Sequence, residues 1–298
     1  MKRIATDVKN GKILVSDGAW GTFLHAMGLK AGECPELWNI NRPEDVLQIA
    51  RSYVQAGADM VETNSFGGTT YKLSSYGLTD RVHEINRAAA AISRKAAGDR
   101  IYVLGSVGPT GKMIIMGDVT PEELYEAYKI QSMALYEGGA DTIIIETMSD
   151  IDEAVAAVKA GKENTPAEVI CTMTFNRSDE GAYHTMMGVT PTEMTQKLVD
   201  SGADIVGANC GNGISNMIGI VSEIRSVNQD IPVLIHANAG VPVYRDGKTV
   251  FPESPDEMAR FVNQLIDAGA NIIGGCCGTS PDHIRKIAEV VRARNKQV

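Results

Sequence analysis

Eight short apolar runs recur along the chain, and each is bounded by glycine or polar residues. They occupy residues 12–20, 56–64, 101–109, 138–147, 168–175, 201–210, 232–240 and 268–277, and four of them contain the phrase Gly-Ala-Asp or Gly-Ala-Asn. Apolar runs of this length that are rich in Ile and Val are typical of strands buried on both faces of a sheet. The pattern therefore predicts eight strands of a parallel sheet.

Amphipathic segments with helical periodicity separate the predicted strands. Clear examples are residues 43–57, 121–139 and 255–270, which begin at Pro and end at or next to Gly, as helices often do. Eight strands that alternate with helices predict the α/β class and a single (β/α)8 TIM barrel rather than an open sheet. Because no linker or low-complexity tract interrupts the pattern, one domain covering residues 1–298 is expected.

Polar residues follow the predicted strands. In a (β/α)8 barrel the carboxyl ends of all strands meet at one end, here called the mouth, where the active sites of this fold lie. The residues expected at the mouth include Asp17, Gly18, Glu62, Thr63, Asn64, Ser106, Glu146, Thr147, Asn209, Cys210, Asn238, Cys276 and Cys277.

Three cysteines stand out among these residues. Cys210 ends the sixth predicted strand, and Cys276 and Cys277 end the eighth, so the fold can bring their sulfurs together. Three thiolates suit tetrahedral Zn²⁺ with an open fourth position. The alternative is that they are small buried core residues, but the glycines beside Cys276 and Cys277 would leave such thiols little core to contact. A zinc held by three thiolates is a weak Lewis acid that is well suited to lowering the pKa of an incoming thiol.

The motifs DGAWGT, ETNSFGGT, GSVGPTG, IIETMSD, GANC, NAGVP and GGCCGTSPDHI resemble those of the zinc-dependent homocysteine S-methyltransferase family. That family includes betaine-homocysteine and S-methylmethionine-homocysteine methyltransferases and the homocysteine module of cobalamin-dependent methionine synthase, which this chain resembles most. The resemblance covers essentially the whole chain. It implies that Cys210, Cys276 and Cys277 bind zinc and that a methyl group moves to the thiolate of homocysteine to form methionine.

The substrate also needs partners for its ammonium and carboxylate groups. The resemblance assigns the ammonium to Asp17 and Glu146, whereas each could otherwise be an ordinary turn or cap residue. Free backbone N–H groups of Gly18 and Ala19, or of the turn that begins at Ser106, are expected to bind the carboxylate.

Other residues near the mouth have expected roles of their own. The resemblance places Asn238 in the open zinc position when homocysteine is absent, although it could equally be a turn residue. Glu62 and Asn64 are expected to shape the mouth. His236 is expected to be a core histidine with its hydrogen bonds satisfied.

The methyl donor has two alternatives. Because the chain ends one helix after the GGCCGTSP motif, whereas methionine synthase continues into folate and corrinoid domains, we expect a separate methyl-corrinoid protein as the partner. A small donor such as S-methylmethionine or a betaine is the alternative. Few aromatic residues are available to cage a quaternary ammonium, although Trp20 and Tyr183 could contribute.

Composition and charge exclude other classes. The net charge of −9 and the pI near 5.1 argue against nucleic acid as a partner. No window has the roughly 18 apolar residues of a membrane span and no signal sequence is evident, so a cytoplasmic location is expected. The five cysteines, an odd number, argue against a disulfide framework.

Three rival functions remain open at this stage. The zinc could activate a different thiol, or a methyl group could flow from another methylated substrate toward a corrinoid. The barrel could be a metal-dependent lyase or aldolase, but it lacks the expected His or carboxylate ligands and a phosphate-binding turn. It could also store zinc without catalysis.

Overall fold

The computed structural model describes residues 3–245 and 247–296; residues 1–2, 246 and 297–298 of the expected domain lie outside the described residues. Eight parallel strands form one sheet in the order β1-β12-β9-β8-β5-β4-β3-β2. The strands are β1 (Leu14–Val15), β2 (Met60–Glu62), β3 (Tyr102–Val107), β4 (Thr142–Met148), β5 (Glu168–Met173), β8 (Ile205–Gly213), β9 (Val233–Asn238) and β12 (Ile272–Gly275). The outer strands β1 and β2 meet where the Asp59 N–H donates to Val15 O at 2.7 Å. The predicted (β/α)8 barrel is confirmed.

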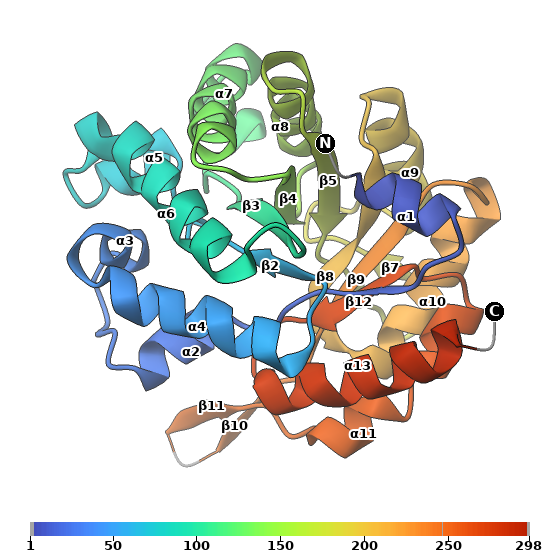
Figure 1. Ribbon diagram of the computed structural model, residues 1–298. Coiled ribbons are helices and arrows are strands. Elements are labelled where there is room, and N and C mark those ends of the chain that lie inside the picture. Colours follow the sequence, from blue (N-terminus) through green and yellow to red (C-terminus); the bar gives the residue numbers. More distant parts are fainter. Residues whose placement is uncertain (1–2, 246, 297–298) are drawn as a thin grey trace.

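Helices surround the barrel (Figure 1). The longer ones are α4 (Pro43–Ala56), α6 (Val82–Ala97), α7 (Pro121–Glu137), α8 (Ile151–Asn164), α9 (Pro191–Asp200), α10 (Ile214–Val227) and α13 (Pro281–Asn295). The shorter ones are α1 (Ile4–Lys9), α2 (Gly21–Ala26), α3 (Trp38–Asn41), α5 (Thr70–Ser74), α11 (Pro255–Ala259) and α12 (Val262–Asp267). The continuous helix predicted at residues 255–270 is therefore wrong, because the segment is divided into α11 and α12. At the break the Phe261 N–H donates to Met258 O, three residues back rather than four.

The repeated Gly-Ala-Asp/Asn phrase is a strand clamp. Each of its glycines has a positive φ, between 96° and 112°, which glycine adopts without steric cost where the preceding helix ends. The Asp or Asn side chain then accepts the backbone N–H of a residue in the preceding strand, and its own N–H donates to the carbonyl of that residue, at 2.7–2.9 Å. The clamp residues are Asp59, Asp141, Asp204 and Asn271, and their partners are Val15, Val103, Val169 and Val233.

The interior of the barrel has an apolar layer and a polar layer. The apolar layer, at the amino ends of the strands, contains Leu14, Met60, Leu104, Ile144, Ile170, Ile205, Leu234 and Ile272. Because side chains alternate along a strand, residues two or four positions further also point inward. These positions hold Glu62, Ser106, Glu146, Thr172, Asn209, His236 and Cys276. The strand alternation alone thus directs polar and sulfur-bearing side chains toward the mouth.

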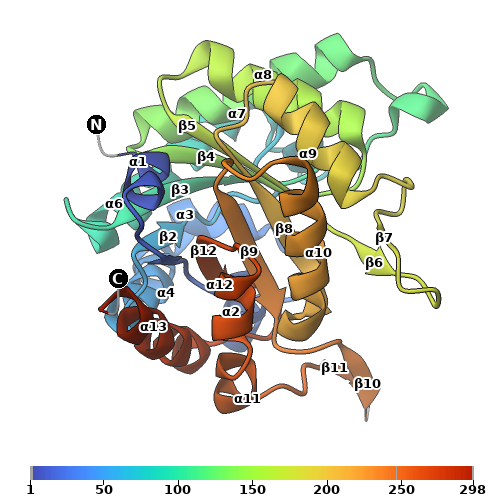
Figure 2. The same ribbon diagram turned by 90° about the vertical axis from the view of Figure 1, so that its right-hand side faces the viewer.

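The two ends of the barrel carry different elements, a helix at one end and two hairpins at the other. Helix α1 is fixed below the apolar layer, where Ile4 N–H donates to the Glu168 carboxylate at 2.6 Å. Two hairpins, β6–β7 (Asn176–Arg177 and Tyr183–His184) and β10–β11 (Val243–Arg245 and Lys248–Val250), project on the side away from α1 (Figure 2). Among the described residues, no helix combines the length and apolar character that crossing a membrane requires.

Candidate metal and substrate site

Three thiols meet at the mouth of the barrel. The sulfurs of Cys210, Cys276 and Cys277 all lie within 4.8 Å of one another, and those of Cys210 and Cys277 are 4.0 Å apart. Cys210 lies on β8, and the other two follow β12. The predicted convergence of cysteines that are distant in sequence is confirmed, and the cluster has the geometry to hold a metal ion.

Backbone geometry fixes the turn that carries Cys276 and Cys277. Thr279 Oγ1 donates to Cys276 O at 2.8 Å and accepts the Ala19 N–H at 3.1 Å. Gly278 has φ +81°, and a Cβ there would lie 2.3 Å from the Phe251 side chain, so only glycine fits this position. The turn is therefore held against the segment that follows β1 and the segment that follows hairpin β10–β11.

The electrostatics of the cluster favour a bound cation. Contacts with the thiols of Cys276 and Cys277 lower the pKa of Cys210 to about 3, whereas the contact with Cys210 raises the pKa of Cys277 to about 11. Without a metal, therefore, only one of the three thiols is readily ionised. A divalent metal would favour ionisation of the other two, because it binds cysteines as thiolates. The buried Oδ1 of Asn238 has no hydrogen-bond partner beside the cluster, which also fits a metal site.

A cavity of about 280 Å³ opens beside the sulfurs. Its lining includes the predicted site residues Gly18, Ala19, Glu62, Asn64, Ser106, Glu146, Cys210, Cys276 and Cys277. Trp20, Leu24, Pro35 and Phe66 form an apolar wall. No Lys or Arg is among the described lining residues. Asp17 and Asn238 are buried behind this lining rather than part of it.

Buried carboxyl groups make the cavity acidic. Burial raises the pKa of Asp17 and of Glu146 to about 7 each, and it raises the pKa of Glu62 well above its ordinary value. Asp17 Oδ2 accepts the indole N–H of Trp20 at 2.9 Å and the backbone N–H of Glu62 at 2.8 Å. Ser106 Oγ donates to Glu146 Oε1 at 2.5 Å. An ammonium group would stabilise the ionised forms of these acids.

One expectation about this region is wrong in part, and a second is wrong. The backbone N–H groups of Ala19, Ser106 and Gly108 are not free for a carboxylate, because they already donate to Thr279, Thr63 and Phe66, respectively. His236 is buried but not satisfied: its Nδ1 lies 3.4 Å from Glu62 Oε1, and its Nε2 has no partner. Burial lowers the pKa of His236 to about 3.

Thr147 and Asn209, which the sequence placed at the mouth without a role, acquire importance from the structure. Thr147 and Cys210 are the non-glycine residues with positive φ among those described, at 62° and 60°. Asn209 links these two residues, because it directly precedes Cys210 in the chain and its side chain hydrogen bonds to Thr147. The inward strand position of Asn209, directly before a cysteine, was the available sequence signal.

The fold and the site together define a (β/α)8 barrel enzyme whose cysteine cluster opens into an acidic cavity. The chain belongs to the homocysteine S-methyltransferase family, whose model matches residues 14–291. This finding confirms the family resemblance described from the sequence motifs.

Known relatives are consistent with this membership. The chain is 33% identical over 299 residues to a methionine synthase of Mycobacterium tuberculosis and 32% identical over 298 residues to that of Mycobacterium leprae. These matches cover 96% and 95% of this chain but only 25% of each relative, so the chain spans about a quarter of their length. Two structures of the Escherichia coli homocysteine methyltransferase MmuM, its oxidized and metallated forms, share the fold, each with a TM-score of 0.78. Their sequence identities to this chain are 23% and 22%. The alignments cover 98% and 95% of this chain, and 100% and 98% of the MmuM chains.

Proposed function

We propose that this chain, as a single barrel domain of residues 1–298, transfers a methyl group to the thiolate of homocysteine and so forms methionine. The observation that carries this proposal is the opening of three clustered thiols into a cavity lined by buried carboxyl groups. The thiol cluster, with a bound metal, suits the sulfur of an amino-acid thiol, and the carboxyl groups suit its ammonium group. Family membership supports the same activity.

We infer that Cys210, Cys276 and Cys277 bind Zn²⁺, which lowers the pKa of a substrate thiol and keeps the resulting thiolate nucleophilic. The soft sulfur ligands favour zinc over hard cations such as Mg²⁺ or Ca²⁺. We propose that Asn238, whose side chain contacts Cys210 and whose Oδ1 has no hydrogen-bond partner, occupies the open metal position until a substrate arrives.

The other residues of the site would hold the amino-acid end of the substrate. Glu146 and Glu62 line the cavity and face the ammonium, and Asp17 supports them from behind. We propose Gly18, which lines the cavity, as the backbone partner for the carboxylate. A side chain at this position would collide with Thr279 and Tyr53, so glycine is required there. With the substrate fixed, its sulfur forms a bond to the methyl carbon while the bond from carbon to the donor breaks.

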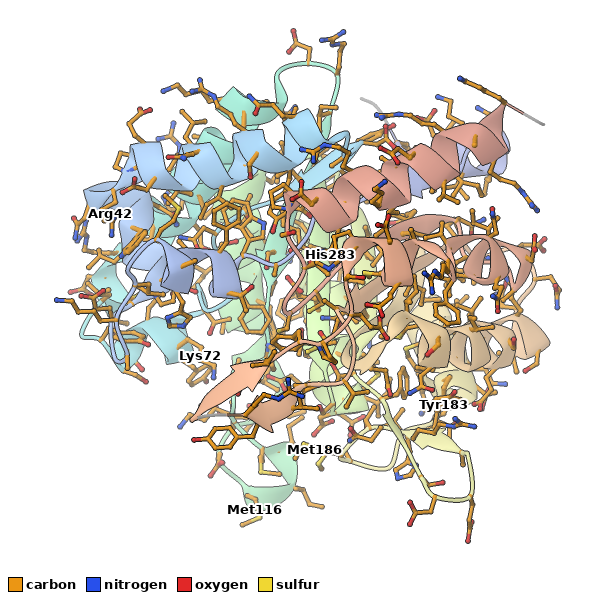
Figure 3. All side chains as sticks on the ribbon, turned by 90° about the horizontal axis from the view of Figure 1, so that it is seen from below. Arg42, Lys72, Met116, Tyr183, Met186 and His283 are labelled. Carbon is orange, nitrogen blue, oxygen red and sulfur yellow. The ribbon has the colours of Figure 1, made fainter. Side chains whose placement is uncertain are left out.

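We propose a methyl-corrinoid protein as the donor. The support is the similarity to methionine synthases and a set of exposed apolar residues on connecting segments and on the β10–β11 hairpin. These are Met113, Ile115, Met116, Met186 and Tyr244, which we call the apolar rim; their exposed fractions run from 41% to 84%. Figure 3 shows Met116 and Met186 along the edge of the molecule at which hairpin β10–β11 lies. Exposed patches rich in Met commonly mark surfaces that bind proteins.

A thiol and donor panel tests this function. The zinc-loaded protein would be incubated with homocysteine, cysteine or mercaptoethanol and with methylcobalamin, a methyl-corrinoid protein, S-methylmethionine or betaine. We expect methionine from homocysteine, with the highest rate from the corrinoid protein. Methylation of another thiol in preference to homocysteine, or no transfer from any donor, would refute the proposal. Highest rates with S-methylmethionine or betaine would refute the corrinoid donor alone.

A further inference from the structure

One side chain connects the thiol cluster to the acidic wall of the cavity. Asn209 is fully buried, and its carboxamide uses both of its polar atoms. Oδ1 accepts the Thr147 N–H at 2.8 Å and the Thr172 hydroxyl at 2.7 Å. Nδ2 donates to Thr147 Oγ1 at 2.7 Å and lies 4.0 Å from Cys276 Sγ. This side chain on β8 thus reaches β4, β5 and the turn after β12.

The residues that Asn209 holds are conformationally unusual. Thr147 is β-branched and has φ 62°, a left-handed conformation that is sterically unfavourable for such a residue without compensation. Asn209 binds both the backbone N–H and the hydroxyl of Thr147, so it stabilises that conformation directly. Cys210, which directly follows Asn209 in the chain, has φ 60°. The left-handed residues therefore follow Glu146 and Asn209, at the two points where β4 and β8 present their functional side chains.

We propose that Asn209 is a positioning residue that sets the thiol cluster and Glu146 relative to each other. Its Nδ2 supplies an N–H group toward the Cys276 sulfur, and its bonds to Thr147 fix the backbone that carries Glu146. Metal affinity and affinity for the amino-acid end of the substrate are then both set by one carboxamide. This inference rests on the proposed function, because it takes the cysteines as ligands of a metal ion.

The variant Asn209→Asp separates positioning from general stability. It keeps the shape of the side chain and an oxygen for Thr147 N–H and Thr172. It replaces the amide NH₂ group, which donates to Thr147 Oγ1 and lies near Cys276 Sγ, by a charged oxygen, so it weakens the hold on Thr147 as well as the contact with the cluster. Thr172→Val is the matched control, since it removes one hydrogen bond to Asn209 and leaves the Nδ2 contacts in place. In the double variant Thr147→Gly with Asn209→Asp, glycine adopts the left-handed conformation without help.

The experiment measures zinc affinity by competition with a chelator, the thiolate-to-metal absorption band of the Co²⁺-substituted protein, and the KM for homocysteine. We expect Asn209→Asp to lower zinc affinity about 10- to 100-fold, to shift the Co²⁺ band and to raise the KM. Thr172→Val should leave all three close to wild type. In the double variant the KM should recover while zinc affinity stays low.

Three results would overturn the inference. The first is wild-type zinc affinity and KM in Asn209→Asp, and the second is an equal loss of both in Thr172→Val, which would show a merely structural role. The third, relevant if Asn209→Asp does not fold, is a folded double variant that binds zinc as wild type does. Failure of the proposed function looks different: wild-type protein would bind zinc without methylating homocysteine, while the ratio of zinc affinities between variant and wild type would still test Asn209.

Discussion

Glu146 is the carboxyl group on which the proposed recognition of the substrate depends most. It lines the cavity, is buried, and accepts a hydrogen bond from Ser106. Glu146→Gln keeps the shape but removes the charge that would face the ammonium. The loss of one charge-assisted hydrogen bond, about 1.5–3 kcal/mol, should raise the KM for homocysteine about 10- to 100-fold. Steady-state kinetics checks this, with the exposed Glu122→Gln on α7 as the control. An unchanged KM would contradict the role.

The buried acids also predict a pH dependence of ligand binding. Burial raises the pKa of Asp17 and Glu146 from 3.8 and 4.5 to about 7, so both are largely neutral at pH 6 and largely ionised at pH 8. An ammonium group binds the ionised form, so affinity should increase as the pH rises across this interval. Methionine is the better probe, because it has no thiol proton of its own; calorimetric titration at pH 6, 7 and 8 gives its Kd.

The same pKa shifts have the opposite effect on the ligand-free protein. Between about pH 4 and 7 the folded state retains protons that the unfolded state has lost, so these two groups make folding less favourable as the pH rises toward 7. Bound methionine should reduce this loss. A methionine Kd that does not change between pH 6 and 8, or that increases, would contradict the proposal that Glu146, with Asp17 behind the lining, stabilises the ammonium.

Sequence reasoning at the residue scale placed most side chains of the site but failed for backbone groups. Cys276 and Glu146 could be placed because strand alternation directs them inward, whereas Cys210 follows the inward Asn209 and could be placed only by its position at the end of a strand. The N–H groups of Ala19 and Ser106 could not be assessed, because the hydroxyls that engage them belong to Thr279 and Thr63, whose positions depend on the completed fold.

At the scale of elements, the repeated phrase has a structural explanation rather than a catalytic one. Each clamp joins one strand to the strand before it at the end of the barrel opposite the mouth, and three clamps use Asp where the fourth uses Asn271. The repeat could be found in the sequence, but its purpose could not, because the bond partner lies on a different strand. The division between α11 and α12 was likewise missed, since periodicity alone does not reveal a local tightening of the helix at Phe261.

The clamp predicts the effects of two substitutions at one site. Asp204→Ala leaves the Val169 N–H without its acceptor and should lower the free energy of unfolding by about 1–3 kcal/mol. Asp204→Asn should retain most of the stability, because Asn271 makes the same bond at the equivalent position. Urea denaturation measures both, with the exposed Asp200→Ala as control. Equal destabilisation by Asn and Ala would show that the carboxylate charge, rather than the clamp, is responsible.

At the scale of the whole molecule, the barrel corresponds to about a quarter of the methionine synthases to which it is similar. A donor that approaches the mouth would meet the apolar rim before it reaches the thiols.

Sequence reasoning predicted the barrel and the end that carries the site, since both follow from strand count and alternation. It did not predict the apolar rim, because the exposure of Met116 and Met186 depends on how their loops project.

The apolar rim can be tested against a donor that does not need it. The double variant Met116→Asp with Met186→Asp places charges on a surface proposed to contact a protein, so it should slow transfer from a methyl-corrinoid protein about tenfold or more. Transfer from free methylcobalamin should change little. The control is Val227→Asp, an exposed position at the end of α10. Equal slowing with both donors would contradict the proposed docking surface.

The most direct test of the central claim is zinc K-edge X-ray absorption of the purified protein, with and without homocysteine. The proposed chemistry requires that Cys210, Cys276 and Cys277 bind the metal together and that the substrate sulfur completes the set. We predict three sulfurs and one lighter atom without homocysteine, and four sulfurs with it. Fewer than three sulfurs, or a coordination shell that homocysteine does not change, would contradict the account.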